Sequence, residues 1–175
     1  LTPRVALLMA AVMNFIGALL GTGVAETIGS GIVEVAPSDG ISGLLVVIAG
    51  LVGAVVWNLT TWWFGLPSSS SHALIGGLAG AGLAAAFTVH WSVIGMKVIV
   101  PMFVSPFVGF GLAYLLMSLI RRTFQNATYK TTMKRFRVAQ TVSAAAVALG
   151  HGLQDAQKTM GVIVIALVAG GYHEG

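Results

Sequence analysis

The stretch ISGLLVVIAGLVGAVVWNLTTWWFGLPSSSSHALIGGLAGAGLAAAFTVHWSVIGM, residues 41–96, decides the fold because it contains no Asp, Glu, Lys or Arg. A helix that crosses the hydrocarbon core of a bilayer needs about 20 apolar residues, so this stretch is too long for one crossing. Two polar interruptions, residues 65–71 and 88–90, divide it. We therefore predict that it leaves one membrane surface and returns, either as two full crossings or as a re-entrant hairpin.

The composition of the whole chain indicates the same class of protein. Of the 175 residues, 57% are hydrophobic and only 8% are charged, and the mean hydropathy is +0.93. Soluble domains carry about 25% charged residues, so this chain has too little polar surface to remain in solution. We predict an all-α, polytopic integral membrane protein embedded in the lipid bilayer. The absence of cysteine excludes disulfides and thiolate metal sites.

Three further apolar stretches flank the central one. Residues 5–25 and 98–120 are each long enough for one spanning helix, and Pro101 and Pro106 are expected to kink the second. Residues 138–171 form the last apolar stretch, which is interrupted at Gly150-His151-Gly152. We expect broken or re-entrant helices at such interruptions.

The positive charges of the chain gather in residues 121–137. This segment contains no acid and holds six basic residues, Arg121, Arg122, Lys130, Lys134, Arg135 and Arg137. Such a segment between apolar runs is typical of a cytoplasmic loop and argues against a nucleic-acid partner. Counting spans from this loop places on the outer side Glu26, Glu34, Asp39, His173 and Glu174.

A run of four serines, Ser68, Ser69, Ser70 and Ser71, follows Pro67. Proline ends the preceding helix and serine is a favoured N-cap residue, so a new helix is predicted to begin in the run. A helix N-terminus presents free N–H groups and a partial positive charge, and neighbouring hydroxyls add donors for phosphate or sulfate oxygens. The alternative is an ordinary capped loop at the surface.

The second polar cluster is GHGLQDAQKTMG, residues 150–161. An ionised Asp155 at the bilayer centre would cost about 2.5–3.5 kcal/mol on insertion scales, so it is expected to face a cavity, a partner or an ion. Lys158 lies on the same helix face, where the two side chains can pair. The pair either neutralises itself or belongs to a cation or proton site beside an anion site. The sequence leaves three roles open for His72 and His151, namely packing, capping and proton transfer.

Both clusters resemble motifs of one family. GLPSSSSHALIG, residues 65–76, resembles the serine/threonine-rich signature of the PiT (inorganic phosphate transporter) family. HGLQDAQKTMG, residues 151–161, is similar to the His-Gly-x-Asn-Asp-x-Gln-Lys segment of that family and looks like its bacterial low-affinity branch. The family has two inverted repeats. The resemblance thus implies a central fragment, with the latter part of the first repeat at 1–120, a cytoplasmic loop at 121–137 and the start of the second repeat at 138–175.

The resemblance also implies a function and a set of site residues. It implies secondary active import of inorganic phosphate, free or as a divalent-metal complex, by symport with H⁺ in preference to Na⁺, without a cofactor and across the plasma or inner membrane. Phosphate would contact Ser68, Ser69, Ser70, Ser71, Asp155 and Gln157. The coupling cation would bind Asp155 and Gln154, where Gln154 stands in place of the family's Asn. The accessory residues would be His72, His151, Lys158 and Thr159.

Other functions stay open at this point. A sulfate permease of the same fold, a channel or a non-transporting membrane subunit would share these helices. An intramembrane hydrolase would need a serine nucleophile within hydrogen-bond reach of a histidine base, either His72 or His151. His72, however, follows the serines directly, and the side chains of adjacent helical residues point apart. We therefore predict a protein that is not an enzyme and that has no metal site of its own. The sequence leaves the oligomeric state open, with a homodimer as one possibility.

Overall fold

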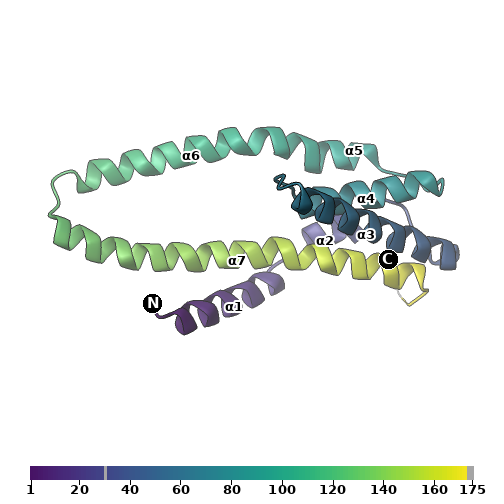
Figure 1. Cartoon of the computed structure of the whole chain (residues 1–175), viewed down its shortest axis with the longest axis horizontal. Helices are drawn as coiled ribbons and strands as arrows, with labels where there is room; N and C mark the ends of the chain where they lie inside the picture. The colour runs from purple at the N-terminus through teal and green to yellow at the C-terminus, as the bar shows by residue number, and fades with distance from the viewer. Residues whose placement is uncertain (30, 173–175) are drawn as a thin grey trace. The chain divides into compact units, whose positions relative to one another are not determined.

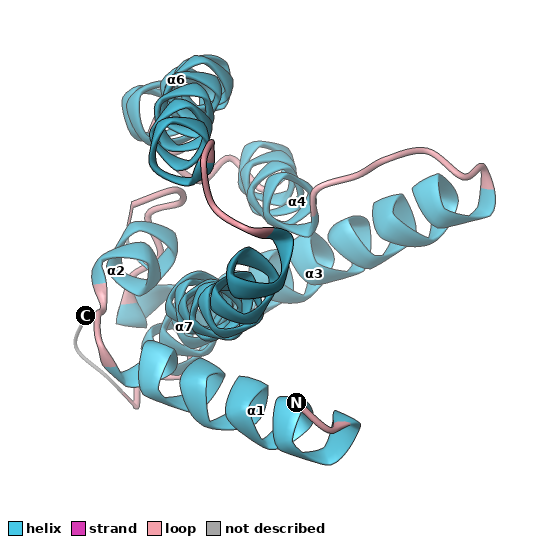
Figure 2. Ribbon diagram, turned by 90° about the vertical axis from the view of Figure 1, so that its left-hand side faces the viewer, coloured by secondary structure: helices cyan, strands magenta, loops and turns pink. Residues whose placement is uncertain are grey.

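The computed structural model describes residues 1–29 and 31–172, and every regular element among them is helical (Figures 1 and 2). Within that range, β-type pairing is limited to one isolated bridge between Val33 and Val89. The all-α prediction is therefore confirmed. His173 and Glu174, which were expected on the outer side, lie outside the described residues.

Among the described residues, two helical stretches are long and apolar enough to cross a membrane. The first, Pro37–Trp63, joins the short 3₁₀ helix η1 (Pro37–Asp39) to α3 (Gly40–Trp63). The second, Trp91–Phe124, joins α5 (Trp91–Ile94), a π-helical turn η2 (Gly95–Ile99) and α6 (Val100–Phe124). Only in combination do α1 (Pro3–Leu19) and α2 (Gly23–Gly29) qualify, as one bent span.

The one spanning helix predicted over residues 5–25 is interrupted in the structure. α1 ends at Leu19, and α2 begins at Gly23. Gly21 lies in the break and Gly23 begins α2, and each glycine disfavours a helix by about 1 kcal/mol relative to alanine. Thr22 between them starts the next turn, because its carbonyl oxygen accepts from the backbone N–H of Glu26 at 2.9 Å. Its hydroxyl donates to the Glu26 carboxylate at 2.6 Å.

The described chain divides into two compact units. The first unit consists of Leu1–Leu20 and Ile99–Leu153, and thus holds α1, α6 and the first part of α7 (Tyr129–Ala169). The second unit consists of Gly21–Val98 and Gln154–Gly175.

In the first unit, the basic segment 121–137, which is predicted to lie on the cytoplasmic side, is mostly helical. α6 continues to Phe124 and α7 begins at Tyr129, so only residues 125–128 connect them. The Phe124 and Phe136 rings pack with their centroids 5.2 Å apart across this turn. A cluster of basic residues predicts where a segment lies relative to the membrane, but it does not break a helix, because Lys, Arg, Met and Gln are all good helix formers.

The expected interruption at Gly150-His151-Gly152 is wrong, because α7 runs without a break from Tyr129 to Ala169. Glycine serves here for close packing, since a Cβ at Gly152 would clash with the backbone of Asn14 in α1. The contact between the two helices stabilises a helical conformation that local propensity alone disfavours.

In the second unit, α3 packs against α4 (Ser70–Ala84). The core between the elements of this unit is made of aliphatic side chains that are almost fully buried, among them Ile32, Val33, Leu78 and Ile165. Helix-free stretches at residues 64–69 and 85–90 confirm both polar interruptions of the central stretch. With 15 residues, α4 is shorter than a membrane span, whereas α3 with 24 residues is long enough.

Candidate functional site

The serine run begins α4 as predicted. Ser69 is the N-cap residue, and its hydroxyl oxygen accepts a hydrogen bond from the backbone N–H of His72 at 3.4 Å. Ser70 and Ser71 then form the first turn of the helix. Gly65, with a φ of +63°, reverses the chain after α3, a conformation that glycine adopts without strain.

The four serines do not face one space. One pocket, of about 560 Å³, is lined by Ser68 and Ser69, and we call it the Ser68 pocket. Its other lining residues are Gly53, Trp57, Pro67, His72, Ala73, Gly76 and Gly77. A second pocket, of about 520 Å³, is lined by Ser70, and we call it the Ser70 pocket. Its other lining residues are Leu51, Leu74, Asp155, Lys158, Thr159, Val162 and Ile163. Ser71 lines neither pocket.

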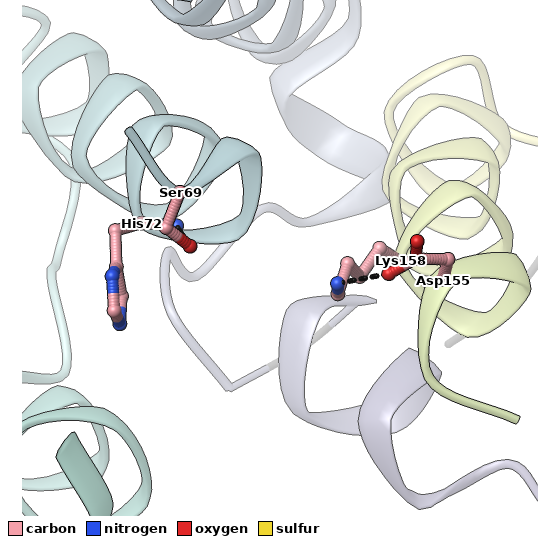
Figure 3. Close-up of polar contacts among 4 residues, drawn as sticks. All are labelled: Ser69, His72, Asp155 and Lys158. Carbon is pink, nitrogen blue, oxygen red and sulfur yellow. Dashed lines mark hydrogen bonds and ion pairs between the residues drawn. The ribbon is translucent and has the colours of Figure 1, made fainter. Parts of the chain in front are cut away.

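The Ser70 pocket thus joins the two polar clusters of the sequence, because α4 contributes Ser70 and α7 contributes Asp155, Lys158 and Thr159. The Lys158 ammonium contacts the Asp155 carboxylate, as predicted for residues three apart on a helix. The Lys158 side chain is 20% exposed and that of Asp155 is 47% exposed, so both remain accessible from the pocket. Figure 3 shows this pair on α7, with the His72 ring on α4 directed away from it.

Three other predicted residues do not line the Ser70 pocket. Gln157 is only 3% exposed, and its side-chain oxygen accepts a hydrogen bond from the backbone N–H of Val24 at 2.8 Å. Gln154 is exposed on α7 without lining this pocket. His151 belongs to the other unit of the chain.

The lining of the Ser70 pocket suits a small oxyanion. Two hydroxyls and one ammonium group can donate hydrogen bonds, and the Asp155 carboxylate can accept one from a protonated ligand oxygen. The charges of Asp155 and Lys158 cancel, so an anion alone would bring uncompensated negative charge into an otherwise apolar pocket. In the described part of the chain, no group of three His, Cys, Asp or Glu residues is placed to hold a metal ion.

Sequence reasoning missed one polar contact close to this region. The Lys97 ammonium, in the π-helical turn η2, donates to the Thr27 hydroxyl of α2 at 3.1 Å. The signal in the sequence was the isolation of Lys97, which is the single charged residue between the apolar runs 41–96 and 98–120.

The sequence profile of the phosphate transporter family matches residues 1–173. The chain is 62% identical over 154 residues to a probable low-affinity inorganic phosphate transporter of Streptomyces halstedii, an alignment that covers 88% of this chain and 71% of that protein. It is 44% identical over 174 residues to a probable low-affinity inorganic phosphate transporter of Bacillus subtilis (strain 168), covering 99% of this chain and 52% of that protein.

The low-affinity inorganic phosphate transporter PitB of Escherichia coli (strain K12) is more distant, at 36% identity over 196 residues, covering 95% of this chain and 39% of that protein. The chain therefore spans about half, or less, of the length of several curated relatives that it matches. No solved structure matches it. The matched family is one of membrane transporters and not of enzymes, and its profile covers nearly the whole sequence. The chain belongs to the phosphate transporter family.

Proposed function

We propose that the intact protein imports inorganic phosphate across the cell membrane by cation symport, and that the Ser70 pocket is the part of the phosphate site supplied by this chain. The observation that carries the proposal is that Ser70 of α4 and the Asp155–Lys158 pair of α7 line one pocket. The names of the relatives support phosphate as the substrate.

Phosphate would bind through hydrogen bonds and one charge contact. The hydroxyls of Ser70 and Thr159 and the ammonium of Lys158 would donate to its oxygens. The apolar side chains of the pocket would exclude water and strengthen these bonds, because electrostatic attraction grows as the local dielectric constant falls. Ser68 and Ser69 line a different pocket, so in this proposal Ser70 carries the contact that the serine run makes beside Asp155.

Coupling to a cation follows from the charges. In the structure, Lys158 contacts Asp155. When Lys158 turns toward phosphate, the Asp155 carboxylate takes up the coupling cation in its place, so that anion and cation enter together. We propose H⁺ as this cation and phosphate, free or as a divalent-metal complex, as the transported species, since QKTMG, residues 157–161, resembles the bacterial low-affinity branch. The basic segment 121–137 is proposed to lie on the cytoplasmic side.

The test is uptake of labelled phosphate into proteoliposomes that contain the intact protein, under an imposed pH gradient or an imposed Na⁺ gradient. We expect the pH gradient to drive uptake, and we expect excess sulfate to leave it unchanged. Asp155→Asn should abolish uptake while expression and membrane insertion persist. Asp39→Asn, a matched change at an acid outside the Ser70 pocket, should retain it. Unaltered uptake by Asp155→Asn would remove Asp155 from the mechanism.

A further inference from the structure

The short helix α2 is held in place by polar contacts from two sides. It has only seven residues, which is too short for a helix to be stable by itself. Its conformation must therefore come from its neighbours in the second unit. Those neighbours are the α7 segment next to Asp155 and the turn that carries Lys97.

The contact with α7 is both polar and close. The Gln157 side-chain oxygen accepts from the Val24 N–H in the first turn of α2 at 2.8 Å. One turn further along α7, a Cβ at Gly161 would come within 2.7 Å of the Ile28 Cβ and 2.8 Å of the Ala25 carbonyl oxygen. Since only glycine permits this approach, α2 lies directly against α7 at Gln157 and Gly161, and these two residues do not line the Ser70 pocket.

The contact with Lys97 completes a chain of hydrogen bonds. The Lys97 ammonium donates to the Thr27 hydroxyl at 3.1 Å, and that hydroxyl donates to the Gly23 carbonyl oxygen at 2.8 Å. Within the described residues, Thr27 is the partner of this ammonium, and no acid pairs with it. Lys97 is exposed, so water solvates its charge, and the hydrogen bond to Thr27 adds a positional restraint on α2.

We propose that Lys97 is a positioning residue: through Thr27 it holds α2 against the α7 segment that carries Asp155 and Lys158, and so keeps the Ser70 pocket in its binding geometry. This inference rests on the proposed function. α2 itself does not line the pocket, so Lys97 acts through α2 and through the contacts of α2 with Gln157 and Gly161. Loss of the Lys97–Thr27 hydrogen bond reduces the fraction of molecules that are competent to bind phosphate. The apparent affinity for phosphate falls in proportion to that fraction.

The first experiment measures phosphate uptake kinetics of the intact protein in proteoliposomes. Lys97→Met should raise the KM for phosphate roughly three- to tenfold and change the maximal rate less than about twofold, because the loss is in the competent fraction. Lys97→Arg, which keeps a donor, should restore most of the affinity. Thr27→Val should raise the KM to a similar extent, whereas Thr27→Ser, which keeps the hydroxyl, should leave it unchanged. The KM of the Lys97→Met/Thr27→Val double variant should not exceed the higher KM of the two single variants, because both changes remove the same contact. Lys130→Met, the same change at an exposed lysine of α7, is the matched control.

The second experiment reports on α2 without depending on transport. The chain has no cysteine, so Ala25→Cys introduces a single thiol at a position that is 8% exposed on the inner face of α2. Its rate of labelling by a maleimide should rise roughly three- to tenfold with Lys97→Met and stay unchanged with Lys130→Met. Equal labelling in the Lys97→Met and parent proteins would overturn the inference. Faster labelling with an unchanged KM would overturn the positioning role. An absence of phosphate uptake by the parent protein would overturn the proposed function alone, because the labelling rate still tests whether Lys97 keeps α2 packed against α7.

Discussion

The side-chain oxygen of Gln157 lies 2.8 Å from the backbone nitrogen of Val24 and accepts the hydrogen bond that joins α7 to the first turn of α2. The family resemblance implies that Gln157 contacts phosphate. In the structure this side chain is buried and its oxygen is engaged, whereas Asp155 and Lys158 line the Ser70 pocket. To reach an anion there, Gln157 would have to release α2.

Replacing Gln157 tests whether the contact with Val24 supports the fold. Gln157→Met keeps the length of the side chain and removes the acceptor, and we expect the free energy of unfolding to fall by about 1 kcal/mol, the usual net value of such a bond. Gln157→Glu keeps an oxygen in place but buries a carboxylate without a counter-charge, so it should lose more. Thermal unfolding of the detergent-solubilised intact protein measures both, and equal stability of Gln157→Met and the parent protein would show that the bond contributes nothing.

Because Ser68 and Ser70 line different pockets, we expect their hydroxyls to contribute unequally to phosphate binding. Ser70→Ala removes a donor from the pocket that contains Asp155, whereas Ser68→Ala acts in the other pocket. One hydrogen bond to a charged ligand contributes about 1.5–3 kcal/mol, so Ser70→Ala should raise the phosphate KM by about tenfold or more. The increase for Ser68→Ala should be clearly smaller. Uptake kinetics of the two variants, with Ser118→Ala on the exposed α6 as a control, decide the point, and the reverse order would assign the site to the Ser68 pocket.

The Asp155–Lys158 pair predicts an unequal response to single and double changes. Lys158→Met leaves a carboxylate in the pocket without its ammonium partner, so the pocket should repel phosphate and uptake should fall by about tenfold or more. The Asp155→Asn/Lys158→Met double variant removes the repulsion, and it should recover phosphate binding without recovering pH-driven uptake. Phosphate binding by isothermal calorimetry, measured beside uptake, separates the two effects. Equal binding by Lys158→Met and the parent protein would contradict the prediction.

Two glycines of α7 should respond to alanine with opposite signs. A Cβ at Gly161 meets Ile28 and Ala25 of α2 at 2.7 and 2.8 Å, so Gly161→Ala should separate the helices and destabilise the protein by about 1–3 kcal/mol. A Cβ at Gly150 meets nothing within 4 Å, so Gly150→Ala should stabilise the continuous helix by up to about 1 kcal/mol. Thermal unfolding compares the pair directly. A stabilising Gly161→Ala would show that α2 does not approach α7 as closely as described.

The sequence predicted the class, the beginning of α4 and the pairing of Asp155 with Lys158, because each depends on local chemistry. The same Gly-x-Gly pattern, however, occurs at residues 21–23 and 150–152 and behaves differently at the two places. The first separates α1 from α2, whereas the second lies inside α7, where Gly152 packs on Asn14. A glycine disfavours a helix by only about 1 kcal/mol, so tertiary packing decides, and that packing is not visible in a local pattern.

The candidate site was predictable in part for the same reason. Both polar clusters were identified from their residues, but their division into a Ser68 pocket and a Ser70 pocket depends on which face of α4 meets α7. Lys97 was overlooked because its partner, Thr27, lies far from it in the chain. Contacts between distant segments are set by the fold, and a single sequence contains no periodic signal for them.

The length of α4 has a consequence for the route of an ion. Fifteen residues span about 22 Å, whereas the hydrocarbon layer is about 30 Å thick. The Ala84 end adjoins a polar recess lined by Glu34 and Asp39. If that recess lies at an aqueous boundary, a helix of this length places the serine end partway through the bilayer. An ion bound at Ser70 would then have only part of the membrane thickness left to cross.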